Sequence, residues 1–169
     1  MRYLIVLMIA FSLYAGALHE AVYEADMKKV EAIIISGVNI DDANQAGLSA
    51  LHVAIKLDDT TMAKYLLKHG ADINFQDLNG NTPLILAIKK KNLELTTFVV
   101  LEGADVNLAN NDGVTPLHQA AFSGNEKVVD FLLKAKANPN VKNNDGATPY
   151  DFAIAKKFLT IAQLIKMSM

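Results

Sequence analysis

A short motif recurs along this chain at a fixed interval. The letters TPLH at residues 115–118 have one near copy at residues 82–85 and another at residues 148–151, a period of about 33 residues. Self-similarity at a fixed period of about 20–50 residues is the signature of a repeat architecture, so this feature constrains the fold more than any other. A glycine precedes each copy at the same spacing: Gly47, Gly80, Gly113 and Gly146.

The same register continues on both sides of the motif. The letters LHEA at residues 18–21 match LHVA at residues 51–54, so one further step of the same period finds an earlier copy. An apolar pair recurs in the second half of the units, as Leu66-Leu67, Val99-Val100 and Leu132-Leu133. Since end units need a solvent-compatible outer face, the two degenerate outer copies are expected to act as caps. The predicted units are residues 18–46, 47–79, 80–112, 113–145 and 146–169.

Each unit is predicted to form two short helices. Thr115 occupies a position that favours a helix N-cap, and the proline that follows suits the first helical position. Leu117 and Ala120, three residues apart, give this helix one apolar face. Gly70 and Gly103 are expected to end the second helix in the left-handed conformation. Because one such unit cannot bury its apolar face alone, neighbouring units are expected to stack.

This pattern resembles the ankyrin repeat, which has about 33 residues per unit and a Thr-Pro-Leu-His-x-Ala type signature. The resemblance covers residues 18–169. It implies an all-α solenoid of stacked helix-turn-helix units with β-hairpin-like loops. It also implies a concave face, built from loop tips and the exposed side of the first helices, that binds protein partners.

The chain departs from the family pattern at several positions. Ile85 and Asp151 replace the histidine of the motif. Lys136 stands where Gly70 and Gly103 stand in other units, which weakens the prediction of a left-handed residue at that turn. Lys166 replaces the second residue of the apolar pair and fits a face that meets water.

The resemblance also maps a candidate binding surface onto this sequence. Phe122 is the expected anchor, because an exposed aromatic ring in the middle of an array suits an interface. Lys156 maps to the same face as Phe122. The residues predicted to bind a protein partner are Leu48, Leu57, Leu78, Lys89, Lys90, Val114, Gln119, Phe122 and Phe152.

The first residues have a different composition. Arg2 precedes an apolar run over residues 4–13, and residues 15–17 read Ala-Gly-Ala. This is the layout of a secretory signal peptide, and the run is shorter than the roughly 20 residues of a membrane-spanning helix. We therefore expect residues 1–17 to be a signal peptide and residues 18–169 to be the ankyrin-repeat domain. Cleavage after Ala17 would start the mature chain at Leu18, where the first repeat begins, whereas cleavage after Ala15 would leave two residues to begin the first helix. An additional apolar helix that caps the first repeat and an uncleaved anchor are the alternatives.

These features predict an exported bacterial protein. It would be periplasmic in a Gram-negative cell and secreted otherwise, as a monomer with no stable membrane insertion after leader removal. The chain has no cysteine, which fits an oxidising compartment. Its net charge is −2 and Arg2 is its one arginine, so no nucleic-acid partner is expected.

No catalytic or metal constellation is predicted. His19, His52 and His118 share one repeat position. Neighbouring repeats place this position about 8–10 Å apart, and His118 lies two repeats after His52, whereas zinc ligands converge within about 2.0–2.3 Å of one point. The resemblance assigns these histidines to hydrogen bonds that tie the loops of their own or a neighbouring repeat. Ser49 is expected to cap a helix and Ser123 to lie in the inter-helix turn. The acidic pairs at residues 41–42 and 58–59 are expected in turns, as solvated caps.

The sequence therefore predicts a non-enzymatic protein–protein interaction module with an unidentified protein partner and no cofactor. Two alternatives follow from resemblance to small signal-bearing bacterial ankyrin proteins and from the leader. The first is a periplasmic accessory factor in peroxide defence or haem delivery to catalase. The second is a secreted, host-directed effector.

Overall fold

The computed structural model describes residues 16–169, which form helices joined by turns and loops without a β-strand. The predicted signal peptide lies outside the described residues except for Gly16 and Ala17. The chain divides into two compact units. Unit 1 extends to Leu78 and unit 2 covers Asn79–Met169.

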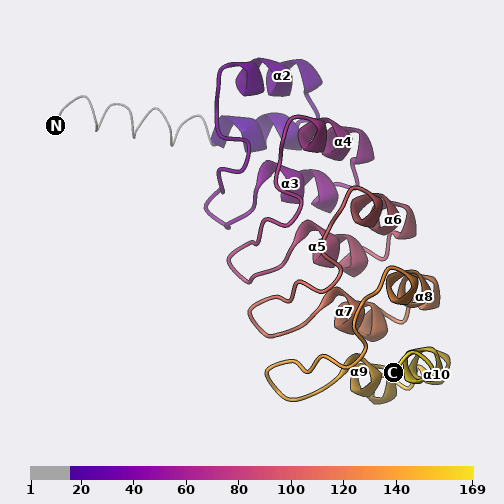
Figure 1. Cartoon of the computed structure of the whole chain (residues 1–169). Coiled ribbons are helices and arrows are strands. Elements are labelled where there is room, and N and C mark those ends of the chain that lie inside the picture. The colour runs from indigo at the N-terminus through magenta and orange to yellow at the C-terminus, as the bar shows by residue number, and fades with distance from the viewer. Residues whose placement is uncertain (1–15) are drawn as a thin grey trace. The chain divides into compact units, whose positions relative to one another are not determined.

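Each unit consists of helical pairs (Figure 1). In unit 1, residues 16–23 are helical and are followed by α2 (Met27–Ile35), α3 (Ala50–Lys56) and α4 (Thr60–Lys68). Unit 2 contains α5 (Pro83–Lys89), α6 (Leu93–Leu101), α7 (Pro116–Ser123), α8 (Glu126–Lys134), α9 (Pro149–Ala155) and α10 (Leu159–Lys166).

The helices of unit 2 stack in two rows. The first helices of its repeats, α5, α7 and α9, pack side by side, and so do the second helices, α6, α8 and α10. Each first helix also packs against the second helix of its own repeat. The predicted fold class, an all-α repeat solenoid of helix-turn-helix units, is confirmed.

The first helices begin at the predicted residues. Thr82, Thr115 and Thr148 are the N-caps of α5, α7 and α9, and a proline follows each at the first helical position. Ser49 caps α3 in the same way. Asp151 replaces the histidine of the motif but completes its capping box, since its carboxylate accepts the backbone N–H of Thr148 at 2.8 Å.

The second helices begin at polar caps, of which the sequence interpretation predicted only the acidic pair at residues 58–59. The side chains of Asp26, Asp59, Asn92 and Asn125 accept backbone N–H groups at the starts of α2, α4, α6 and α8. These caps recur with the same period as the motif. Asp59 confirms the expectation that the acidic pair at residues 58–59 serves as a cap.

The repeat leucines form the core. Leu51, Leu84 and Leu117 in the first helices and Leu66, Val99 and Leu132 in the second helices have no exposed surface. Ile154 of the last repeat is 42% exposed, although the equivalent Ile88 and Ala121 are buried. Lys166 is exposed, as predicted, so the outer side of the last repeat is part apolar and part charged.

The loops of neighbouring repeats fit closely. The N–H of Asn144 donates to the carbonyl of Asp112 at 3.0 Å, and the side-chain amide of Asn144 donates to the carbonyl of Asn111 at 2.9 Å. Gly113 has a φ of +73°, and a Cβ there would lie 2.8 Å from the side-chain oxygen of Asn144. The recurring glycine is therefore required both for its left-handed backbone and for the approach of the next loop.

The turn after the second helix keeps its left-handed geometry even where glycine is replaced. Gly70 and Gly103 are left-handed, with φ of 92° and 101°, as predicted. Lys136 is also left-handed, with φ of 71°, despite its side chain. Its carbonyl accepts the side-chain amide of Asn107 at 3.3 Å, and Asn107 in turn accepts the N–H of Asn138 at 2.7 Å. Contacts with the preceding loop hold Lys136 where glycine would be expected.

Replacing Leu117 tests the stacking register. Leu117→Ala should lower the free energy of unfolding by about 2–5 kcal/mol, because it leaves a cavity at a fully buried site. Ser123, which is the last residue of α7 and not a turn residue, is half-buried, and Ser123→Ala should change stability by no more than about 0.5 kcal/mol. Urea unfolding followed by circular dichroism measures both. Equal losses at the two sites would contradict the assigned register.

Candidate protein-binding surface

The residues predicted to bind a partner are divided between the two units. Leu48, Leu57 and Leu78 belong to unit 1, whereas the remaining six belong to unit 2. The largest exposed fractions among the apolar ones are those of Leu78 at 69% and Phe122 at 46%.

In unit 1, the predicted leucines have different surroundings. Leu78 lies directly against Gly47, which precedes Leu48 in the chain. Leu48 is half-buried, and its carbonyl accepts the imidazole Nε2 of His19 at 2.7 Å. Leu57 is exposed and follows α3 as its C-cap. Leu48 and Leu78 thus gather near the loop, whereas Leu57 lies at the end of a helix.

In unit 2, Phe122 and Phe152 come together. Their ring centroids are 6.3 Å apart at an angle of 66°. Phe152 also meets the ring of His118 edge-on at 5.1 Å. The ammonium of Lys156 lies over the Phe122 ring, 4.0 Å from its centroid. Because cations are attracted to aromatic faces, this contact and the edge-on packing fix the ring of Phe122 although almost half of the residue is exposed.

His118 anchors this aromatic group to the scaffold. Its Nε2–H donates to the carbonyl of Ala147 in the next repeat at 3.0 Å, so Nδ1 is the acceptor, 2.8 Å from the hydroxyl of Thr115. Burial lowers the pKa of His118 because the charged imidazolium would lose its water. The neutral ring therefore joins two repeats, and His19 makes the equivalent bond to Leu48. The predicted loop-tying role is confirmed for both histidines.

The other predicted residues of unit 2 lie on α5, on α7 and in the loop before α7. Lys89 occupies in α5 the repeat position that Phe122 occupies in α7, and its ammonium donates to the side-chain oxygen of Asn81 at 2.9 Å. Lys90 follows as the exposed C-cap of α5. Gln119, half-buried one turn before Phe122, donates to the hydroxyl of Ser123 at 3.1 Å. Val114 is half-buried in the preceding loop, and its N–H donates to Asn110.

We call the surface formed by Phe122, Phe152, Lys89, Lys90 and Lys156 the aromatic–lysine face. Lys89 and Lys156 have no carboxylate partner among residues 16–169. Phe122 lies on the middle helix of the row α5, α7 and α9. The face therefore combines a fixed apolar ring with ammonium groups on the helices to either side.

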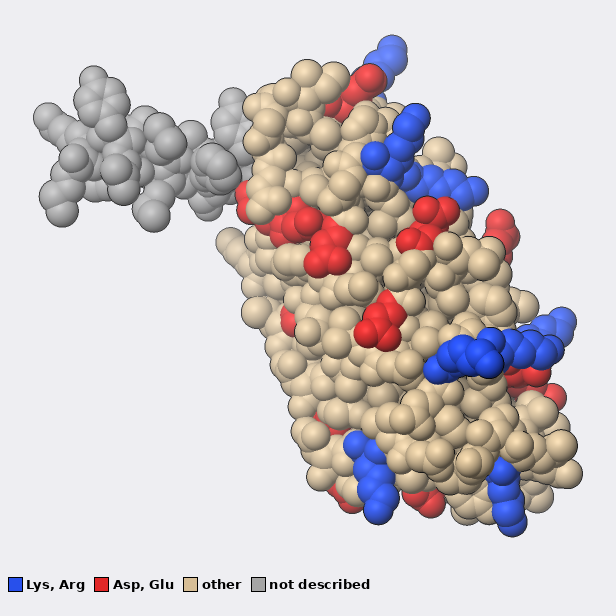
Figure 2. All heavy atoms as spheres, viewed as in Figure 1, with Lys and Arg blue, Asp and Glu red and all other residues tan. Residues whose placement is uncertain are grey.

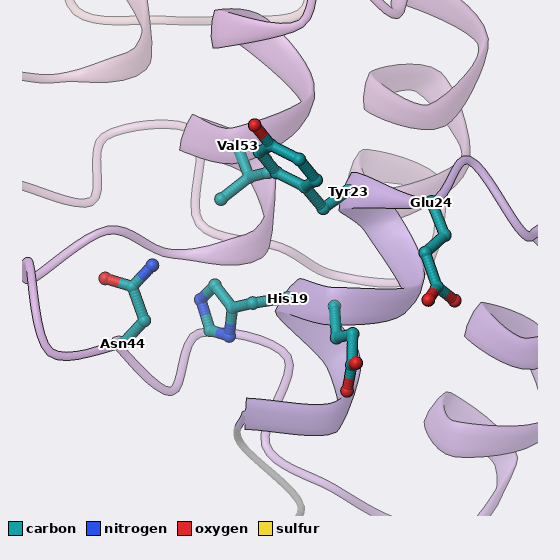
Figure 3. Close-up of a pocket in the computed structure, with 6 residues that line it drawn as sticks. His19, Tyr23, Glu24, Asn44 and Val53 are labelled. Carbon is teal, nitrogen blue, oxygen red and sulfur yellow. The ribbon is translucent and has the colours of Figure 1, made fainter.

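Unit 1 has a different feature, an open pocket of about 360 Å³ beside the first helix. Figure 3 shows His19 and Asn44 on one side of this pocket and Tyr23 and Val53 on another, while the carboxylate of Glu24 points away from them. Glu24 instead pairs with Lys29 at 3.1 Å. The His19 side chain is engaged by the Leu48 carbonyl, so the pocket is lined mainly by groups with structural roles.

The two units also differ in charge. Unit 1, from residue 16, has ten acidic residues and five lysines, whereas unit 2 has eight acidic residues and ten lysines. Figure 2 shows the charged side chains as separate groups on a mainly uncharged surface, with the largest continuous acidic area over the N-terminal repeats. A partner that contacts unit 2 thus meets a mildly basic surface.

The acidic pair at residues 41–42 has a structural role. The carboxylate of Asp41 accepts the N–H of Asp72 in the next loop at 2.8 Å. Partial burial raises the pKa of Asp41, and the hydrogen bond from Asp72 opposes this change. Asp41 therefore links two loops, as Asn107 does in unit 2.

The described part of the chain offers neither a metal-binding cluster nor a membrane-spanning helix. Within residues 16–169, no group of three or more His, Asp or Glu side chains is arranged to hold a metal ion. None of the helices over the same residues is both long enough and apolar enough to span a bilayer. Since His19 and His118 hold loops, the haem alternative gains no site from them.

The comparisons agree with this architecture. A family model described as ankyrin repeats (3 copies) matches residues 18–110 and residues 87–168. The two matches overlap and together cover nearly the whole of the described chain. A comparison with curated proteins gave no match.

The neutral state of His118 predicts a pH dependence of stability. Its pKa is lowered in the folded chain, so the unfolded chain takes up the proton first, near the ordinary histidine value of about 6.5. The contribution of the neutral His118 ring to the free energy of unfolding should be fully present above that pH. It should decrease as the pH falls below that value. Nuclear magnetic resonance titration of the His118 ring, together with urea unfolding between pH 7.5 and 5, measures both effects.

The variant His118→Ile is the matched control, because Ile85 occupies this position in the preceding repeat and is fully buried. It should be less stable than the unmodified chain at pH 7.5 and should lose less additional stability on acidification. The range above pH 5 avoids Asp151, whose pKa the Thr148 hydroxyl lowers and whose contribution is lost only in more acid solution. An unchanged pH slope would show that His118 is not held neutral.

Proposed function

Because the chain belongs to the ankyrin-repeat family, we propose that it is a non-enzymatic adaptor that binds one protein partner through the aromatic–lysine face of unit 2. The observation that carries this proposal is the half-exposed ring of Phe122, held by Phe152 and Lys156 on the middle helix of a packed row. Ankyrin repeats indicate a protein–protein interaction module. Our proposal adds the location of the contact surface, which is the aromatic–lysine face.

The physical support is pre-organisation. A large aromatic ring contributes apolar contact area, and few rotatable bonds have to be fixed when it is buried by a partner. The ring of Phe122 already has neighbours that restrict it, so binding would cost little further side-chain entropy. Interface energy is usually concentrated in a few such anchors, with charged groups at the rim. Lys89, Lys90 and Lys156 would form that rim.

A capture experiment tests the proposed surface. The full chain, immobilised and exposed to an extract of its source cells, should retain a defined protein that is then purified and titrated. The triple variant with Phe122→Ala, Lys89→Glu and Lys90→Glu should bind that protein at least about tenfold more weakly, as expected for removal of an anchor and its charged rim. Lys127→Glu in α8 is the control, because it makes a charge change of the same kind on a second helix. Equal affinity of the unmodified chain, the triple variant and the control would show that the partner binds at another surface.

We also propose that the chain is exported before it acts. Support comes from the composition of residues 1–17 and the absence of cysteine from the sequence. Gly16 and Ala17 are helical, and cleavage after Ala15 would keep both of them. Cleavage after Ala17 would shorten the same helix by two described residues. Processing after Ala15 is therefore the proposed site.

Mass spectrometry of the protein from fractionated source cells tests export. The expected result is a mature N-terminus at Gly16, in the periplasmic fraction of a Gram-negative cell or in the medium of another cell. An N-terminus at Leu18 would leave export intact and correct the cleavage site. Recovery of the chain with Met1 in the cytoplasmic fraction would contradict export.

A further inference from the structure

We infer that the aromatic–lysine face recognises an acidic segment of its partner in which carboxylates flank an apolar side chain. This inference rests on the proposed function and specifies the chemistry of the partner. Three features of unit 2 carry it. They are the order of charges along the first helices, the lack of a carboxylate partner for Lys89 and Lys156, and the position of the acids of α9 and its loop at the other end of that helix.

The order of charges follows from the repeat register. Lys89 and Phe122 occupy the same repeat position, and so do Lys90, Ser123 and Lys156. Because α5 packs against α7 and α7 packs against α9, the cations lie at the ends of the helices on either side of Phe122. A partner segment that crosses the ends of these helices would place one central side chain on the Phe122 ring. The side chains before and after it in the segment would then meet the lysines of α5 and α9.

The lysines are available for carboxylates. The Lys89 ammonium is bound only to the neutral amide of Asn81, and the Lys156 ammonium lies on an aromatic face. Neither contact neutralises the positive charge. An ammonium group has three donors, so each lysine retains the capacity to bind a carboxylate. Apolar contact with the Phe122 ring would also exclude water from these charge pairs and strengthen them.

The acidic groups of α9 and of the loop before it lie at the opposite end of this helix from Lys156. Asp151 of α9 accepts both the N–H and the hydroxyl of Thr148 at the start of its helix, at 2.8 and 2.7 Å. Asp145 accepts the side chain of Asn143 in the loop before α9. These acids lie at loops and helix starts, whereas Lys90 and Lys156 lie at helix ends. The face therefore keeps a local basic character.

Lysines at helix ends also have a structural explanation, because cations there interact favourably with the helix dipole. That explanation predicts an effect on stability alone. It does not predict a preference for acidic ligands, and it assigns no role to Phe122. A binding measurement that depends on both the lysines and Phe122 separates the two explanations.

A displayed library of random 12-residue peptides, selected on the folded full chain, provides the test. The expected result is enrichment of Asp and Glu on both sides of a Leu, Ile, Met or aromatic residue. The most enriched peptide, labelled and titrated, should bind the Lys89→Glu, Lys156→Glu variant at least about tenfold more weakly than the unmodified chain. Phe122→Ala should weaken binding to a similar extent, whereas Lys127→Glu should change it less than about twofold.

Circular dichroism should show the same helix content for every variant, so that loss of binding is not loss of fold. Selected peptides without acidic enrichment, absence of any enriched peptide, or acidic peptides that bind the charge-reversed variant equally well would overturn the inference. The proposed function is tested separately. It fails if the natural partner binds the triple variant as tightly as it binds the unmodified chain. A natural partner that needs Phe122 but lacks an acidic segment would leave the function standing and reject this inference.

Discussion

Within residues 16–169, a helical pair cannot cover its apolar side chains alone, so each repeat depends on its neighbour. Leu117 lies in α7, between α5 and α9, and has no exposed surface. The loops reinforce this dependence, since the His118 imidazole and the Asn144 amide each cross to the neighbouring repeat. Ile154 of α9 illustrates the same dependence, because it is 42% exposed whereas its equivalents Ile88 and Ala121 are buried between neighbouring helices.

This dependence separates the residues that build the repeats from those left for recognition. Leucines, capping hydroxyls, loop glycines and the tied histidines recur because packing and hydrogen bonding require them. The outward positions at the ends of the first helices are under no such requirement, and they hold lysine in α5 and phenylalanine in α7. A fixed scaffold with variable outward side chains can therefore acquire a specific surface without a change of fold.

The sequence predicted much of the fold because one period recurs in residues with distinct physical roles. Thr115, Leu117 and Gly113 each have one strong conformational or burial preference, and each was placed correctly. The caps Asp26 and Asn125 share the period but were not predicted, since an Asp or Asn in a turn is equally compatible with a solvated loop. Lys136 kept a left-handed backbone because loop contacts override its local preference.

The site was harder to predict than the fold. Sequence mapping placed Phe122 and Phe152 on one face, but it could not give the ring geometry or the position of the Lys156 ammonium over Phe122. These details depend on side-chain rotamers in neighbouring repeats. The most direct test of the stacking is a nuclear Overhauser measurement on the full chain. The stacking predicts cross-peaks from the Phe152 ring to the rings of both His118 and Phe122. Absence of both cross-peaks in the folded chain would contradict the packing of α9 against α7, and with it the proposed face.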